Sequence, residues 1–197
     1  MSKAEKTRAY IVEKTAPLFN AKGYAGTSMS DLEEATGLTK GAIYGNFQNK
    51  DEVALAAFDY NLKQVTSRIN EMVAQRQTAP DQLLAFVDFY RDHFGKGQYR
   101  FGCAIANTAT EADDTHPRLR SRVNAGIVSW KKALVRIMEE GKAAGTIRSN
   151  VQSEVYADLF ISLIEGGIVV SKTMGDLNFL YRSLDQMQRM VTQELST

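Results

Sequence analysis

The sequence predicts an all-α fold, and three observations lead to that prediction. Apolar residues recur at intervals of three and four along most of the chain, which is the spacing of amphipathic helices. No run of alternating β-branched residues is flanked by a two-residue turn. Only three of the 197 residues are proline, and 44% are apolar, so the chain can bury a real core. One domain, or two small ones, is expected at this length.

The first 50 residues are predicted to form three helices, over 3–22, 28–36 and 39–47. Gly23 ends the first of them. Ser28, with Asp31 three residues later, matches a capping box, and Thr39 can cap the third helix. Two short helices joined by Gly37 and Leu38 make a helix-turn-helix.

The rest of the chain is predicted to form longer helices, which brings the total to about nine. Asp51 and Glu52 suit the positive end of a helix dipole, Pro117 suits a first helical position, and Gly145 closes a helix. We therefore expect a DNA-binding domain over residues 1–50 and a second domain over 51–197. The predicted helices of the second domain cover residues 50–76, 81–93, 104–112, 117–144, 153–174 and 176–194.

Composition narrows the functional classes. No apolar leader segment follows Met1, and the apolar-rich stretch at residues 159–164 is too short to span a membrane. A single cysteine excludes an internal disulfide and, with two isolated histidines, leaves no zinc site. We expect a cytoplasmic protein without a metal or cofactor, and not an enzyme. The net charge of +1 decides nothing, because residues 1–50 carry +2 and the remainder −1.

The helix-turn-helix has an apolar face and a polar face. The spacing assigns to the core Leu32, Ala35, Leu38, Ile43 and Phe47. The outward face of the third helix is small, polar and basic, with Thr39, Lys40, Gly41, Ala42, Tyr44, Gly45 and Asn46. Such a helix can enter the major groove of DNA, where Gly41 allows close approach and Lys40 or Tyr44 can contact a base or phosphate. Thr27, Ser28 and Lys50 can hold phosphates at the flanks.

The motif Gly-Tyr-x-x-Thr-Ser, then Asp-Leu, then Ala-x-Gly-Leu-Thr-Lys-Gly-x-Ile-Tyr-x-x-Phe-x-x-Lys resembles the DNA-binding domain of the TetR/AcrR family of transcriptional regulators. The resemblance covers about residues 8–60. It implies DNA contacts at Thr27, Ser28, Thr39, Lys40, Gly41, Tyr44 and Lys50. Asn46 stands where many members of the family carry histidine before the aromatic residue.

The resemblance implies that the remaining residues form a ligand-binding and dimerisation domain. Pockets in helical bundles are mostly apolar with a few polar groups. The candidate lining residues are Phe86, Phe89, Tyr90, Cys103, Asn107, Trp130, Phe160 and Glu165. Residues 102–107 resemble a Gly-Cys-x-x-x-Asn turn of part of the family, so Cys103 with Lys172 could sense oxidants or electrophiles. The alternative is a buried cysteine acting as a small hydrophobe and a lysine at the surface.

The last two helices are the expected seam of a homodimer. One face has Leu159, Leu163, Gly166, Gly167 and Val170, and another has Leu177, Leu180, Leu184, Met187 and Val191. Two recognition helices related by a two-fold axis would read a palindromic operator. The expected function is a ligand-responsive repressor that a small molecule releases from this operator. A sensor acting through Cys103 and a helical scaffold without DNA binding remain as alternatives.

Overall fold

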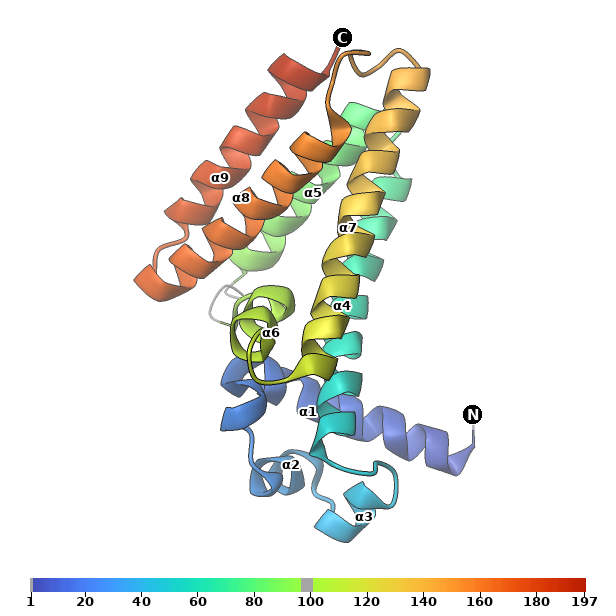
Figure 1. Cartoon of the computed structure of the whole chain (residues 1–197), viewed down its shortest axis with the longest axis vertical. Coiled ribbons are helices and arrows are strands. Elements are labelled where there is room, and N and C mark those ends of the chain that lie inside the picture. Colours follow the sequence, from blue (N-terminus) through green and yellow to red (C-terminus); the bar gives the residue numbers. More distant parts are fainter. Residues whose placement is uncertain (1, 97–100) are drawn as a thin grey trace. The chain divides into compact units, whose positions relative to one another are not determined.

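The computed structural model describes residues 2–96 and 101–197 and confirms the all-α fold (Figure 1). In these residues no strand occurs, and one isolated bridge joins Ile147 to Ser196. The helices are α1 (Lys3–Gly26), α2 (Met29–Thr36), α3 (Lys40–Tyr44), α4 (Lys50–Ala74), α5 (Ala79–Gly95), α6 (Ala104–Ala112), α7 (Pro117–Ala143), α8 (Ser153–Met174) and α9 (Asn178–Arg189), followed by a π-helical segment, η2 (Met190–Leu195).

The predicted ends of α6 and α8 agree with the structure, while the last helix differs from its prediction. Gly175 adopts a left-handed conformation with φ of 67° and ends α8. Asp176 then accepts a hydrogen bond from the Asn178 N–H at 2.9 Å, so the next helix begins later than expected. At the other end the Ser196 N–H donates to the Val191 carbonyl, five residues back, and the helix widens into η2.

The first helix runs past its predicted end. Gly23 has φ of 74° and ψ of 177°, which interrupts α1 without ending it, and one further turn continues to Gly26. Glycine adopts such a positive φ without the steric cost that a Cβ brings. The direction of the chain therefore changes directly before the helix-turn-helix.

Two compact units make up the chain, and neither is a continuous segment. One unit contains residues up to 64 together with 104–125, and the other contains 65–103 together with 126–197. The prediction of a functional boundary at residue 50 remains a prediction. In the first unit Leu32, Ile43 and Phe47 lie in the core as expected, whereas Ala35 and Leu38 are half-buried.

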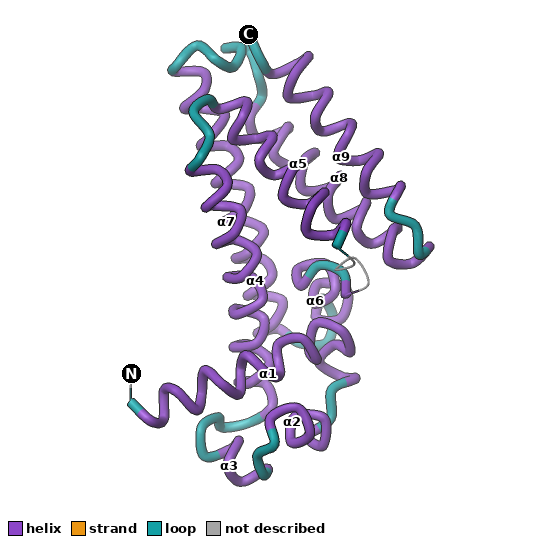
Figure 2. The backbone as a smooth tube through the Cα atoms, turned by 180° about the vertical axis from the view of Figure 1, so that it is seen from behind, coloured by secondary structure: helices purple, strands orange, loops and turns teal. Residues whose placement is uncertain are grey.

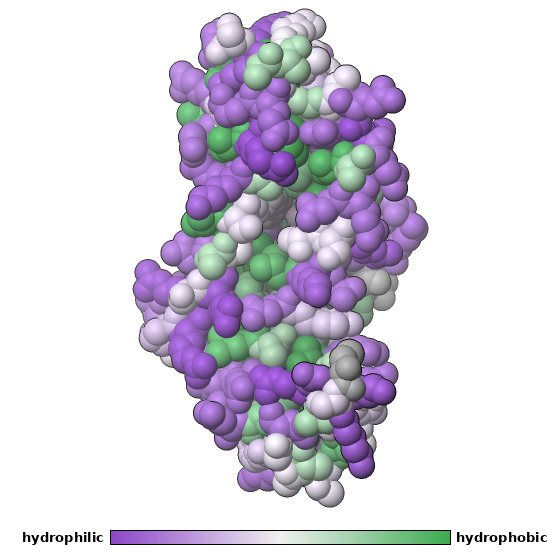
Figure 3. Space-filling model, turned by 90° about the vertical axis from the view of Figure 1, so that its right-hand side faces the viewer, coloured by the Kyte–Doolittle hydropathy of each residue, from purple (hydrophilic) through white to green (hydrophobic). Residues whose placement is uncertain are grey.

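The core of the second unit lies among α5, α8, α9 and the parts of α4 and α7 that belong to it. Figures 1 and 2 show α8 and α9 side by side. Gly167 allows this close approach, because a Cβ there would lie 3.0 Å from Ser183 Oγ and 3.1 Å from Leu180 Cα. The view in Figure 3 shows hydrophobic residues as separate patches among hydrophilic ones. No helix in the described part of the chain is long and apolar enough to cross a membrane.

Candidate nucleic-acid interface

Local contacts fix the start and end of α2 and the start of α3. Ser28 forms the predicted capping box: its hydroxyl accepts from the Asp31 N–H at 3.1 Å, and the Asp31 carboxylate accepts from the Ser28 N–H at 2.7 Å. Gly37 ends α2 in the left-handed region with φ of 67°. Thr39 caps α3 by accepting from the Ala42 N–H at 3.3 Å. These contacts confirm the predicted caps and fix where α3 begins.

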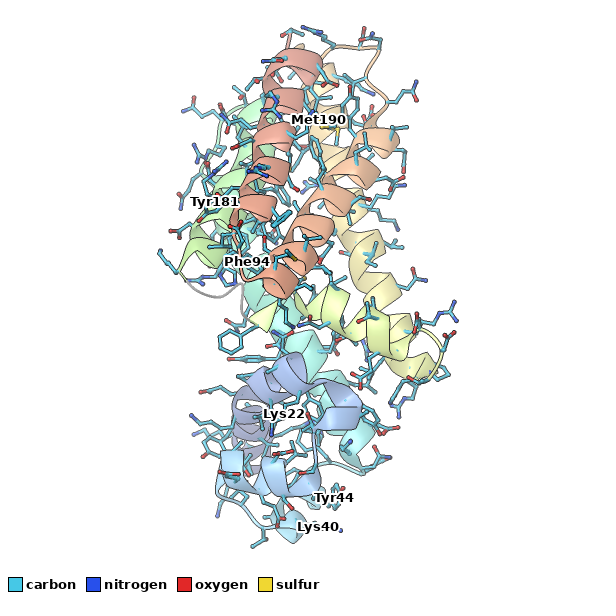
Figure 4. The ribbon with its side chains drawn as sticks, turned by 90° about the vertical axis from the view of Figure 1, so that its left-hand side faces the viewer. Lys22, Lys40, Tyr44, Phe94, Tyr181 and Met190 are labelled. Carbon is cyan, nitrogen blue, oxygen red and sulfur yellow. The ribbon has the colours of Figure 1, made fainter. Side chains whose placement is uncertain are left out.

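The outer face of α3 is open to solvent. Thr39, Lys40 and Gly41 are exposed, Tyr44 is half-buried, and Ile43 points into the core with no exposed surface. Figure 4 shows the side chains of Lys40 and Tyr44 on this short helix, and the Lys40 ammonium lies 5.9 Å from the centre of the Tyr44 ring. A polar, small-residue surface with one cation and one phenol can contact both phosphates and base edges.

Gly41 leaves room for a close neighbour. A Cβ built at this position would meet nothing within 4 Å. The fold therefore imposes no steric need for glycine at this point of α3.

Thr27 and Lys50 occupy supporting positions in the structure. Thr27 is fully buried and its hydroxyl donates to the Gly23 carbonyl at 2.6 Å. The Lys50 ammonium donates to the carbonyls of Tyr24 and Thr27 at 2.7 and 2.8 Å. Both side chains thus stabilise the junction of α1 and α2, a use that the sequence motif does not indicate.

Asn46 also has a local use. Its side-chain amide Nδ2 donates to the main-chain carbonyl of Ala42 at 3.0 Å. The main-chain carbonyl of Asn46 accepts from Arg8 Nη1 at 2.5 Å. The Arg8 guanidinium also lies 3.9 Å above the Phe47 ring and donates to Glu52 at 2.8 Å. Sequence reasoning missed Arg8 as a positioning residue, because its partners lie 38 and 44 residues away and no local pattern marks them.

Two glutamates also position the motif and were not predicted to do so. Glu33 accepts from the Lys40 N–H at 2.7 Å, which adds a cap to α3. Glu111 of α6 accepts from the N–H groups of Tyr24 and Ala25, both at 2.6 Å. The interruption at Gly23 leaves those N–H groups without a partner within α1, so they need another acceptor.

Tyr24 joins α1 to the start of α4. Its hydroxyl donates to Asp51 Oδ1 in a short hydrogen bond. Burial and this carboxylate raise the pKa of the Tyr24 phenol to about 12, while the same bond lowers the pKa of Asp51. The helix-turn-helix is therefore held from α1, α4 and α6.

The residues predicted to line a ligand pocket separate into two groups. Phe86, Phe89, Tyr90 and Phe160 are buried in the core of the second unit, and Trp130, Cys103 and Glu165 are half-buried in the same unit. Asn107 belongs to the first unit, where its amide donates to Asn20 O and Oδ1 at 3.0 Å. The structure thus brings seven of the eight into one unit.

Cys103 and Glu165 are in direct contact. The thiol donates to Glu165 Oε1 at 3.0 Å. A carboxylate partner favours the protonated thiol over the thiolate. Burial raises the pKa of Glu165 itself to about 7, and the bond from Cys103 opposes this shift.

The apolar face predicted as the dimer seam on the last helix is wrong for four of its five residues. Leu180, Leu184, Met187 and Val191 are fully buried within the single chain, because this face of α9 packs on α5 and α8. Gly167 serves the same internal contact. The outer surface of α8 instead carries exposed apolar side chains, with Val155, Leu159, Val169, Val170 and Met174 between 40% and 63% exposed.

A helix-turn-helix with an open polar recognition face, joined to a larger helical unit, defines a DNA-binding transcriptional regulator. Comparison with known proteins identifies the family. Residues 11–57 match the model for bacterial regulatory proteins of the tetR family, and residues 79–187 match the model for the tetracyclin repressor-like C-terminal domain. The chain belongs to the TetR family of transcriptional regulators.

The similar proteins match most or all of the chain. A TetR-family transcriptional regulator from Cytophaga hutchinsonii is 39% identical, with a TM-score of 0.93 over 100% of this chain and 98% of its own. A TetR transcriptional regulator from Chloroflexus aurantiacus is 37% identical, with a TM-score of 0.91 over 100% and 99%. The HTH-type transcriptional repressor DhaR from a Mycobacterium species is 23% identical over 84% of this chain and 82% of its own.

Proposed function

We propose that this protein is a homodimeric repressor that reads a two-fold symmetric operator with α3. A small molecule bound in the second unit would release it from the operator. The observation that carries the proposal is the exposed face of α3, in which Ile43 is buried while Lys40, Gly41 and the edge of Tyr44 remain open. The relative DhaR, which is named a repressor, supports repression over activation.

Symmetry supports the dimeric part of the proposal. A five-residue helix reaches few base pairs, so a second copy doubles the contact and requires half-sites on successive major grooves. The exposed apolar side chains of α8 offer a surface for this pairing.

Release would follow from a shift in population between two conformations. A ligand that prefers the conformation unable to match two successive grooves lowers operator affinity, and operator DNA lowers ligand affinity by the same factor. The contacts from Arg8 and Glu111 to the helix-turn-helix are candidates for elements that such a shift would alter.

The proposal is tested on operator DNA selected from a random pool by the wild-type protein. Lys40→Ala and Tyr44→Ala should each weaken binding about tenfold or more in fluorescence anisotropy, with unchanged circular dichroism. Lys132→Ala removes a lysine of the same charge from α7 and serves as the matched control. Equal operator affinity of Lys40→Ala, Tyr44→Ala and the control would contradict the assignment of α3.

Repression is tested separately, with a reporter promoter that carries the selected site. Expression of the protein should lower reporter output, and output should stay high with Tyr44→Ala. A reporter that rises with wild-type protein would make the chain an activator.

Electrophile sensing through Cys103 is the second candidate, and the contact with Glu165 counts against it, because it favours the less reactive thiol. Under the main proposal, alkylation of the protein with iodoacetamide should leave operator affinity unchanged.

A further inference from the structure

Two buried polar atoms of the second unit have no hydrogen-bond partner in the described part of the chain. They are Glu165 Oε2 on α8 and Trp130 Nε1 on α7. Buried polar atoms are nearly always paired, because leaving a donor or acceptor unpaired costs its full desolvation free energy. One atom is an acceptor that carries negative charge when ionised, and the other is a donor only. A single external group that donates to Glu165 Oε2 and accepts from Trp130 Nε1 would pair both atoms.

The two unpaired atoms belong to one cluster, which we call the Tyr90 cluster and define as Tyr90, Cys103, Trp130 and Glu165. The Trp130 ring stacks on the Tyr90 ring with centroids 5.9 Å apart and planes 26° apart. Cys103 donates to the other oxygen of Glu165 at 3.0 Å. Burial raises the pKa of the Tyr90 phenol well above its usual value, and electrostatic interaction with Cys103 and Glu165 raises it further. Tyr90 therefore lies close to both sides of the cluster.

The cluster favours a cation over an anion. None of its four side chains carries a positive charge in any protonation state. An anionic ligand would be repelled by ionised Glu165, whereas an ammonium group can donate to Oε2 and neutralise its charge. The face of the Trp130 ring that does not stack on Tyr90 attracts a cation as well. The indole N–H adds a requirement for an oxygen acceptor on the same molecule.

We propose that the Tyr90 cluster is the effector subsite, and that it selects an aromatic ammonium compound carrying an oxygen acceptor. The ammonium group donates to Glu165 Oε2, and the oxygen accepts from Trp130 Nε1. This inference rests on the proposed function, since it names the chemical class of the molecule that releases the operator.

The test uses the full chain at about pH 8, above the pKa of Glu165 of about 7, so that the carboxylate is ionised before ligand is added. Thermal shift and calorimetry are measured with tyramine, with its alcohol analogue tyrosol, and with 3-(4-hydroxyphenyl)propanoate. A second series uses 5-hydroxytryptamine, 5-hydroxytryptophol and 5-hydroxyindole-3-propanoate, which all carry a phenolic oxygen as acceptor. The amine should bind about tenfold or more tightly than its alcohol in at least one series, and the acids should not bind.

Two variants separate the contributions of the Glu165 carboxylate and the Trp130 indole N–H to ligand affinity. Glu165→Gln should reduce amine affinity to that of the alcohol, while Cys103 can still donate to the amide oxygen and the fold is retained by circular dichroism. Trp130→Phe keeps the ring and should weaken tyramine several-fold, without weakening 2-phenylethylamine, which lacks the oxygen. Glu154→Gln, at the exposed start of α8, is the matched control and should change nothing. Equal binding of amine and alcohol, tighter binding of the acid, no binding by any amine, or full amine affinity in Glu165→Gln would overturn the proposal.

Operator binding in the same samples distinguishes the two proposals. If an amine binds without lowering operator affinity, the proposal of ligand release is contradicted, but the proposed subsite is not. If the protein binds its operator and represses but binds no amine, the proposed subsite is contradicted, but the repressor function is not.

Discussion

At the scale of single residues, two glycines of the helix-turn-helix have different physical reasons for being there. Gly37 has φ of 67°, a conformation that side chains with a Cβ adopt at a cost. Gly41 is helical and has open space around its Cα. The fold explains the first glycine but not the second, for which the proposed function offers a reason in the close approach of α3 to DNA.

The substitution Gly41→Ala separates these reasons. Alanine should leave the stability of the protein unchanged or raise it by about 0.5–1 kcal/mol, because alanine favours a helix. Operator affinity should fall, because the new methyl group blocks the approach of the backbone to DNA. Urea unfolding and anisotropy measure the two quantities. Gly37→Ala is the control, with an expected loss of stability of about 1 kcal/mol. Unchanged operator affinity in Gly41→Ala would show that α3 does not approach DNA closely at this residue.

At the scale of elements, the ends of helices are held by side chains of other helices. Glu111 of α6 accepts from two N–H groups directly after the interruption of α1, and Lys50 of α4 donates to two carbonyls near the same junction. Main-chain N–H groups and main-chain carbonyls within one short stretch of chain thus both find side-chain partners on other helices. The start of the helix-turn-helix depends on α4 and α6 as much as on its own sequence.

Removal of the Glu111 carboxylate, which accepts from two N–H groups of α1, tests this dependence. Glu111→Ala should lower the free energy of unfolding by about 1–3 kcal/mol, because two N–H groups lose a charged acceptor. Amide hydrogen exchange at Tyr24 and Ala25 should accelerate about tenfold or more. Glu34→Ala removes an exposed glutamate of α2 and is the matched control. If exchange at Tyr24 and Ala25 is as slow in Glu111→Ala as in the control, the cap does not stabilise the junction.

At the scale of the whole molecule, the proposed dimer would pair through the exposed apolar surface of α8. The apolar face of α9 is used within one chain, so it offers nothing to a partner. The exposed side chains on α8 include Leu159, Val170 and Met174, and each costs free energy in water that pairing would recover.

A charge placed on this surface should separate the proposed dimer. Val170 and Val128 are 40% and 43% exposed, on α8 and α7 respectively, which makes them a matched pair. Val170→Glu should weaken self-association about tenfold or more in analytical ultracentrifugation, since burial of an unpaired charge is costly. Operator affinity should fall in parallel. Val128→Glu should leave both unchanged, and equal behaviour of the two variants would contradict pairing through α8.

Local patterns in the sequence determined the helical elements and the helix-turn-helix. The predicted limits of α6 and α8 agree with the structure, as do the caps from Ser28 and Thr39, because capping and helical periodicity depend on residues within one or two turns. The residues buried inside the motif, Leu32, Ile43 and Phe47, followed from the same spacing.

Only the tertiary structure decided which partner each polar side chain takes. Lys50 and Thr27, expected to face DNA, are held by main-chain carbonyls, and Arg8 and Glu111 reach across many residues to the motif. The sequence by itself thus determined where helices form and which family the motif resembles. Packing between helices distant in the chain decided which face of α9 is covered and which carboxylate is left with an unpaired oxygen. Burial and hydrogen bonding are set by neighbours in three dimensions, which local sequence patterns do not determine.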